Sequence, residues 1–108
     1  MANNTLKKTY TPMTETMYYI LLSFLDPRHG YGVFLHVKEL TNGRIHLGAG
    51  TIYNSIAKLE RDGLIVMNAH NIRRKIYEIT NLGRSVLDTE ILRLEELLNN
   101  GKVCLNEN

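Results

Sequence analysis

The 108-residue sequence has few of the residues that build disulfide-rich or membrane-spanning proteins. Its one cysteine, Cys104, excludes an internal disulfide framework and is typical of a reducing cytoplasm, where we expect the protein to act. There is no run of about 18 apolar residues, and no apolar block directly follows the charged residues at the start. We therefore expect neither a membrane span nor a signal peptide in this single, small domain.

Residue patterns typical of catalytic and metal sites are missing as well. The four histidines lack the spacing of metal ligands, and the cysteine lies in the C-terminal tail. The sequence has no serine at a nucleophile elbow and no phosphate-binding glycine loop. We therefore expect a protein that is not an enzyme and that uses no cofactor or metal.

The formal net charge of +2 is small, but charge is unevenly distributed along the chain. Residues 58–75 contain five Lys or Arg and two acids, whereas residues 88–96 contain four acids and one Arg. This asymmetry predicts one surface that faces a polyanion and another surface that is turned away from it.

Residues 49–62 are predicted to form a helix with two different faces. Ile52, Ile56 and Leu59 follow helical spacing and predict a buried stripe, and Gly63 is a typical residue after a helix end. At about 100° per residue, the opposite face collects Gly50, Thr51, Asn54, Lys58 and Arg61. Such a face can approach and hold a polyanion, although a solvated face of any globular domain has the same pattern.

A β-hairpin is predicted directly after this helix. Residues 64–69 and 76–79 have the composition of strands, and the wing between them, residues 70–76, contains Arg73, Arg74 and Lys75. Because side chains alternate in direction along a strand, we expect one or two of these three cations to face DNA. A helix followed by a basic hairpin is the layout of a winged helix-turn-helix, with the helix in the major groove and the wing over phosphates or the minor groove.

Four motifs in this order resemble the PadR family of bacterial transcriptional regulators. They are Gly30-Tyr31-Gly32, Gly50-Thr51-Ile52-Tyr53, the run from Leu59 to Ile65 and the run from Arg73 to Arg84. The resemblance covers about residues 13–98. It implies a mainly α fold with a small β-hairpin (α+β) and a homodimeric DNA-binding regulator. The chain departs from the family at Gly48-Ala49, where Ser-Pro is frequent, and at Asn54, where Pro is frequent; these differences concern DNA specificity rather than fold.

Eight residues are expected to contact double-stranded DNA: Thr51, Tyr53, Asn54, Lys58, Arg61, Arg73, Arg74 and Lys75. Thr51, at a helix N-terminus, suits a phosphate, with simple capping as the alternative. Asn54 and Lys58 suit base edges, or in the case of Lys58 a phosphate. For Tyr53 the resemblance implies a contact with the DNA backbone, and a packing role is the alternative.

The remaining chain is predicted to divide into an arm, two framing helices and a tail. Residues 1–12 are expected to be a flexible arm, and its Lys7, Lys8 and Tyr10 are candidates for phosphate contacts. Residues 13–80 are expected to form the DNA-binding domain and residues 81–98 a C-terminal dimerisation helix. Residues 99–108 are expected to be a flexible tail. Within the domain, residues 13–25 and 31–40 are predicted helices. Residues 44–47 are predicted to be a short extended link, with a small strand paired to the wing as the alternative.

A heptad-like seam in residues 81–98 predicts a homodimer. Its members are Leu87, Ile91, Leu94 and Leu98, and Tyr18 and Leu22 of the helix predicted at 13–25 are the expected partners. Packing of the seam against residues 13–25 of the same chain is the alternative.

The predicted function is a homodimeric repressor that binds a pseudo-palindromic operator. The resemblance also implies release by a small aromatic effector between subunits. Such sites often use tryptophan, which this chain lacks, so Met17, Tyr18 and Tyr19 are the candidate substitutes, with plain interface packing as the alternative. A winged-helix module that binds another protein and no DNA is the second function class; basic residues on both helix and wing favour DNA.

Overall fold

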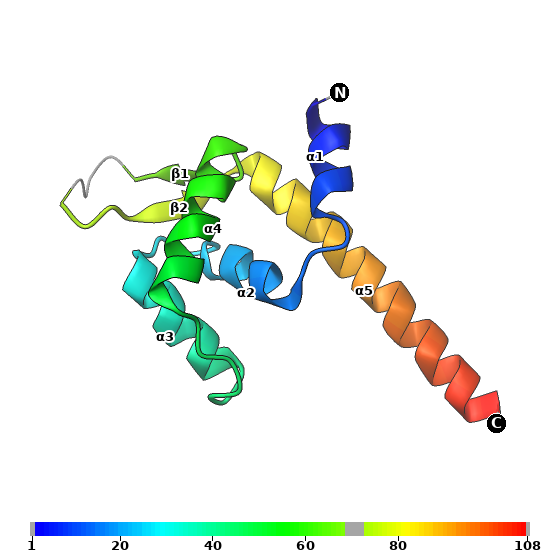
Figure 1. Ribbon diagram of the computed structural model, residues 1–108. Helices are drawn as coiled ribbons and strands as arrows, with labels where there is room; N and C mark the ends of the chain where they lie inside the picture. Colours follow the sequence, from blue (N-terminus) through cyan, green and yellow to red (C-terminus); the bar gives the residue numbers. More distant parts are fainter. Residues whose placement is uncertain (1, 69–72, 108) are drawn as a thin grey trace.

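The computed structural model describes residues 2–68 and 73–107, and within these ranges the chain forms five helices and one two-stranded sheet (Figure 1). The elements are α1 (Ala2–Tyr10), α2 (Glu15–Ser23), α3 (Gly30–Leu40), α4 (Ala49–Arg61), β1 (Ile65–Met67), β2 (Tyr77–Ile79) and α5 (Asn81–Glu107). The predicted mainly α fold with a small hairpin is confirmed. Each of the helices predicted within residues 13–62 is present, with bounds that differ by one or two residues.

The core lies where α2, α3, α4 and the first half of α5 meet the base of the hairpin. Phe24 and Leu59 are completely buried there, and the predicted stripe of Ile52, Ile56 and Leu59 faces this core. The opposite face of α4 is therefore left to solvent, as its composition predicted.

Local signals set the ends of the helices. The Thr14 hydroxyl caps α2 by accepting from the Met17 amide at 3.1 Å. Gly63 follows α4 with φ of 78°, a conformation that favours glycine. The Thr80 hydroxyl begins α5 by accepting from the Gly83 amide at 3.0 Å and donating to the Gly63 carbonyl at 2.7 Å, which joins the two helices.

The sheet consists of β1 and β2, which are antiparallel with Ile65 opposite Ile79. Residues 44–47 form the predicted link, and the alternative of a small strand is wrong, because that segment is irregular in the structure. Arg28 pairs with β2 instead: the Arg28 and Tyr77 backbones exchange two hydrogen bonds of 2.9 Å. The link between α2 and α3 therefore holds the base of the hairpin against the helices.

The flexible arm predicted for residues 1–12 is replaced by α1 over Ala2–Tyr10, which packs against α5. Leu6 packs on the core and Tyr10 is 3% exposed, so Tyr10 is not available as the phosphate contact for which it was a candidate. A nine-residue helix is marginal by itself in water, and contacts from distant residues stabilise it here.

Residues 99–107, part of the tail that we expected to be flexible, are helical in the structure. Helix α5 continues to Glu107, passing through Gly101, whose cost in a helix interior is about 1 kcal/mol relative to alanine. The C-terminal half of α5 extends away from the body of the molecule (Figure 1). From Leu92 onward, α5 carries several exposed apolar side chains: Leu92, Leu94, Leu97, Leu98, Val103 and Leu105.

Candidate nucleic-acid interface

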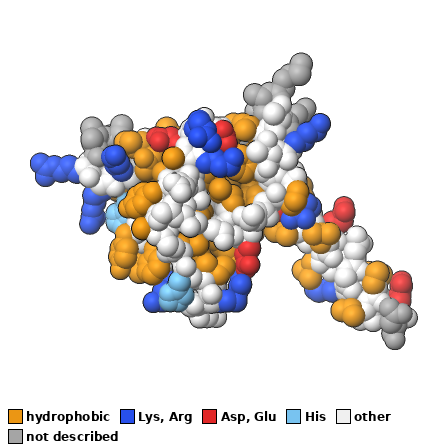
Figure 2. Space-filling model, viewed as in Figure 1, with side chains coloured by type: hydrophobic (Ala, Val, Ile, Leu, Met, Phe, Trp, Pro, Cys, Tyr) orange, Lys and Arg blue, Asp and Glu red, His pale blue; other side chains and the backbone are white. Residues whose placement is uncertain are grey.

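The solvent-exposed face of α4 is the first part of the site. Thr51, Asn54 and Arg61 are exposed along it, on the side opposite the buried isoleucines. Ala57 is exposed on the same face and was not singled out in the sequence; its small side chain keeps the helix backbone accessible. The face is therefore polar and small at its start and basic at its end. Figure 2 shows Lys and Arg side chains above this end and on the hairpin.

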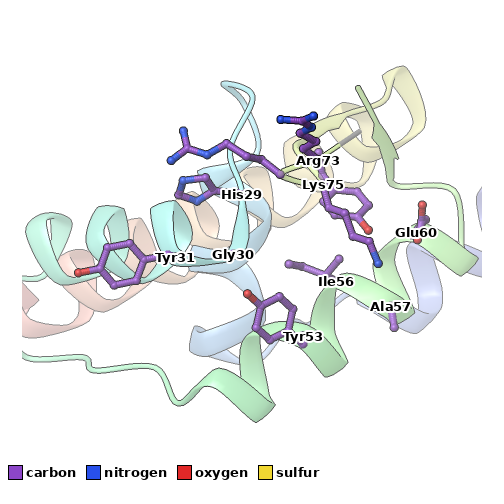
Figure 3. A pocket seen from close by; sticks show the side chains of 11 residues that line it. His29, Gly30, Tyr31, Tyr53, Ile56, Ala57, Glu60, Arg73 and Lys75 are labelled. Atoms are coloured by element: carbon purple, nitrogen blue, oxygen red, sulfur yellow. The ribbon is translucent and has the colours of Figure 1, made fainter. Parts of the chain in front are cut away.

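A groove of about 580 Å³ joins α4 to the wing and to the start of α3. Its walls come from three places in the sequence: His29, Gly30 and Tyr31; Tyr53, Ile56, Ala57 and Glu60; and Arg73, Arg74, Lys75 and Tyr77. Figure 3 shows Tyr53 on the helix side of the groove and Arg73 and Lys75 on the hairpin side. The tertiary structure thus brings the wing cations to a hollow that is bordered by the edge of α4 from Tyr53 to Glu60, whereas Thr51, Asn54, Lys58 and Arg61 do not line it.

The three cations of the wing are not on a strand. Residues 73–75 form a turn, and Lys75 has φ of 48°, a conformation uncommon for a residue other than glycine. All three side chains are exposed and all three line the groove. We expected these side chains to alternate in direction along a strand, so that only one or two would face DNA. That expectation assumed a strand, and the assumption is wrong. Residues 70–72 of the predicted wing lie outside the described residues.

Tyr53 lies on the edge of α4 that faces α3. It is 59% exposed, and its ring packs so closely over Gly30 that a Cβ on Gly30 would lie 2.9 Å from it. The Nδ1 atom of His29 accepts from the Gly32 amide at 2.9 Å and so caps α3. The His-Gly-Tyr-Gly sequence therefore begins α3 and provides the glycine on which Tyr53 packs. The cap could have been recognised from the histidine that precedes the predicted helix.

Lys58 lies on the opposite edge of α4, beside α1. Its Nζ atom is 5.1 Å from the centre of the Tyr10 ring and 3.9 Å from Asp62 Oδ2. The Tyr10 hydroxyl donates to the same Asp62 oxygen at 2.6 Å. Burial and the Asp62 carboxylate raise the pKa of Tyr10, so its hydroxyl stays protonated and acts as a donor. Sequence reasoning missed this cluster because Tyr10 and Asp62 are 52 residues apart.

The predicted dimer seam divides into two parts. Leu87 is buried in the core of its own chain, and Ile91 is partly buried against that core. Tyr18 and Leu22 of α2 are also partly buried there. Leu94 and Leu98 are exposed. The first half of the seam thus follows the alternative of packing within the chain, since the first turns of α5 close the domain core.

Glu90 is a buried acid that the sequence did not reveal. It is 1% exposed and accepts three hydrogen bonds: one from the Met13 amide at 3.0 Å and two from the Arg93 guanidinium at 2.7 Å each. The hydrogen bonds from Arg93, together with that from Met13, lower the pKa of the Glu90 carboxyl despite its burial. Glu90 therefore fixes α5 to the segment that precedes α2.

Neither a metal site nor a membrane span is found among the described residues. No group of three or more His, Cys, Asp or Glu in residues 2–68 and 73–107 is placed to hold a metal ion. Within the same ranges, no helix combines the length and the apolar character needed to cross a bilayer.

A helix with an exposed polar and basic face beside a basic hairpin defines the class of winged helix-turn-helix regulators. The chain belongs to the transcriptional regulator PadR-like family, whose family model matches residues 19–89, well over half of the chain. It is therefore a DNA-binding transcriptional regulator rather than an enzyme, and the family resemblance found in the sequence is confirmed. None of the curated proteins compared with the chain matches it.

Solved structures of similar proteins have the same fold. A PadR family transcriptional regulator from Eggerthella lenta is 24% identical with a TM-score of 0.67, and the match covers 95% of this chain and 88% of that one. A transcriptional regulator from Clostridium thermocellum is 26% identical with a TM-score of 0.61, covering 83% and 87%. A PadR family regulator from Clostridium difficile is 21% identical with a TM-score of 0.63, covering 82% and 97%.

Proposed function

We propose that the protein is a homodimeric repressor that reads a pseudo-palindromic operator with the exposed face of α4 and holds it with the wing. The observation that carries this proposal is the shared groove, in which Arg73, Arg74 and Lys75 meet the exposed edge of α4. A duplex that entered with its major groove on α4 would place a phosphate strand beside the wing.

Each part of the surface has a chemical role in this proposal. Thr51 and the free amides of the first turn of α4 suit a phosphate, and Asn54 suits the edge of an adenine. The wing cations neutralise phosphates and add affinity without reading sequence. Glu60 also lines the groove, and its carboxylate would repel a phosphate that came too deep between helix and wing.

The homodimer in this proposal rests on the C-terminal half of α5. Leu94 and Leu98 continue the heptad-like spacing beyond the core, and Leu98 is 57% exposed on a helix that projects from the body. A partner helix would cover this stripe and relate two copies of α4 by a two-fold axis. Such a dimer requires the two half-sites of the operator to lie about one turn of the DNA helix apart, roughly 34–36 Å, or a multiple of that distance.

Repression and release complete the proposal. A dimer bound over a promoter excludes the polymerase, and its DNA target would place it in the cytoplasm. A small aromatic effector would act at a cavity of about 340 Å³ between α2 and α5, which is lined by Tyr18, Tyr19 and Leu94. The two tyrosine rings form an edge-to-face pair with centres 5.7 Å apart, and a third ring can pack on such a pair.

Base reading and phosphate binding can be separated experimentally. Footprinting on the DNA upstream of the coding sequence gives an operator, and fluorescence anisotropy over a salt series gives affinities for the operator and for random duplex. Asn54→Ala should cost about 1–3 kcal/mol on the operator with an unchanged salt slope and little loss on random DNA. Arg73→Ala or Lys75→Ala should weaken both duplexes and lower the slope by roughly one for each phosphate that is no longer neutralised.

The control variant is Lys102→Ala, which removes one exposed charge near the far end of α5 and should leave the salt slope unchanged. Operator binding by Asn54→Ala at wild-type strength would mean that this residue reads no base. Absence of salt-dependent binding to any duplex would favour the second function class, a winged-helix module that binds another protein.

A further inference from the structure

The cluster of Tyr10, Lys58 and Asp62 joins the N-terminal helix to the C-terminal end of α4. Tyr10 is the last residue of α1, and Asp62 directly follows α4 as its C-cap. The hydroxyl of Tyr10 donates to Asp62 Oδ2 at 2.6 Å, and the Lys58 ammonium lies over the Tyr10 ring. Helix α1 also packs against α5, so it connects the proposed dimerisation helix to the proposed reading helix.

Lys58 remains within reach of DNA although it is part of this cluster. At about 100° per residue, Lys58 lies roughly 20° from Thr51 and 40° from Asn54 around the axis of α4, on the edge beside α1. Its side chain is 42% exposed. The Tyr10 ring beneath the ammonium limits where the flexible lysine can go, since a cation is attracted to the face of an aromatic ring.

The cluster also affects how closely the Lys58 ammonium and the Asp62 carboxylate pair. These two residues are four apart on the helix, a spacing at which a carboxylate and an ammonium pair directly. Direct charged hydrogen bonds are about 2.7–2.9 Å long, whereas Lys58 Nζ is 3.9 Å from Asp62 Oδ2. The short hydrogen bond from the Tyr10 hydroxyl anchors that oxygen and competes with Lys58 for it, so that Lys58 keeps only the longer ion-pair contact.

We propose that Tyr10 is a positioning residue for DNA binding, which keeps Asp62 from bonding Lys58 directly so that the Lys58 ammonium can pair with a phosphate at the end of α4. This inference rests on the proposed DNA contact of α4. Without the Tyr10 hydroxyl, the Asp62 carboxylate rotates toward Lys58 and neutralises it, and one phosphate in each half-site is left without its cation.

The test compares salt slopes of operator binding for a set of full-length variants. Tyr10→Phe keeps the aromatic ring beneath Lys58 and removes only the hydroxyl. Its slope should fall by about 0.9 per subunit, close to 2 for a dimer, with weaker binding at low salt. Lys58→Ala should lower the slope by the same amount, and Tyr10→Phe should cause no further fall when it is added to Lys58→Ala.

A rescue variant distinguishes positioning from a merely structural role. Tyr10→Phe combined with Asp62→Asn should recover the wild-type slope, because an amide in place of the carboxylate cannot neutralise Lys58. A loss of folding alone would not be repaired in this way. Asp62→Asn by itself should keep at least the wild-type slope, which tests the inference even if Tyr10→Phe is unstable; a lower slope for Asp62→Asn would overturn it.

The possible failures differ in what they contradict. A wild-type slope for Tyr10→Phe, beside a reduced slope for Lys58→Ala, would overturn the positioning role and leave the proposed function intact. A wild-type slope for Lys58→Ala would show that Lys58 meets no phosphate and would overturn the inference. No salt-dependent binding by the wild-type protein to any duplex would contradict the proposed function itself.

Discussion

Gly83 sits where the first turn of α5 crosses the base of the hairpin, and replacing it with alanine should destabilise the protein. A Cβ at this position would lie 2.2 Å from the Leu64 carbonyl oxygen and 2.6 Å from Ile79 Cγ1. A carbon and a carbonyl oxygen ordinarily approach to about 3.3 Å. The helix would therefore have to withdraw by about 1 Å from a backbone oxygen that also accepts from the Thr80 amide at 3.0 Å.

The expected loss of stability follows from two opposing effects. Overpacking in a close-packed interior costs about 1–3 kcal/mol, and a rigid backbone oxygen places this site at the upper end of that range. Alanine regains up to about 1 kcal/mol over glycine in a helix. The net change should be a loss of about 2 kcal/mol, or about 8–16 °C in Tm at fixed protein concentration, from about 4–8 °C per kcal/mol for a small domain.

Gly50→Ala is the matched control, because nothing lies within 4 Å of a Cβ on Gly50 and this residue is also in the first turn of a helix. It should leave the free energy of unfolding unchanged or raise it by up to about 1 kcal/mol. Urea and thermal unfolding without DNA measure both variants. If Gly83→Ala were as stable as Gly50→Ala, α5 could not approach Leu64 this closely, and the placement of α5 on the hairpin would be wrong.

Two further predictions concern α5. Leu98→Glu should put a carboxylate into the proposed seam and convert dimers to monomers in sedimentation. Leu92→Glu, at a residue that is 66% exposed off the seam, should leave the dimer intact, and dissociation of both or neither would place the interface elsewhere. Because hydrogen bonds from Arg93 lower the pKa of Glu90 below its ordinary value of 4.5, the stability that Glu90 adds should be fully present above that value and lost as pH falls through its folded pKa. Urea midpoints over a pH series should show that loss in the wild type and a smaller one in Glu90→Gln, and parallel curves would contradict it.

The sequence by itself determined the elements whose causes are local. Ile52, Ile56 and Leu59 specify the buried side of α4 by their spacing, and Gly63 ends the helix with a positive φ. Thr80 predicts the start of α5, because its hydroxyl reaches an amide three residues ahead. These signals act within about one or two helical turns, so a sequence window contains both partners. They were enough to specify the winged fold and the exposed face of α4.

The tertiary structure decided which distant residues meet. Residues 1–12 have the composition of an arm, yet Tyr10 packs in the core and its hydroxyl donates to Asp62, 52 positions later. Leu87 looked like part of an interface, but the body of the domain covers it. Glu90 is paired with the Met13 amide across 77 positions. Burial and pairing of this kind depend on surfaces that exist only after the helices pack. The periodicity of the sequence therefore does not predict which distant residues will be in contact.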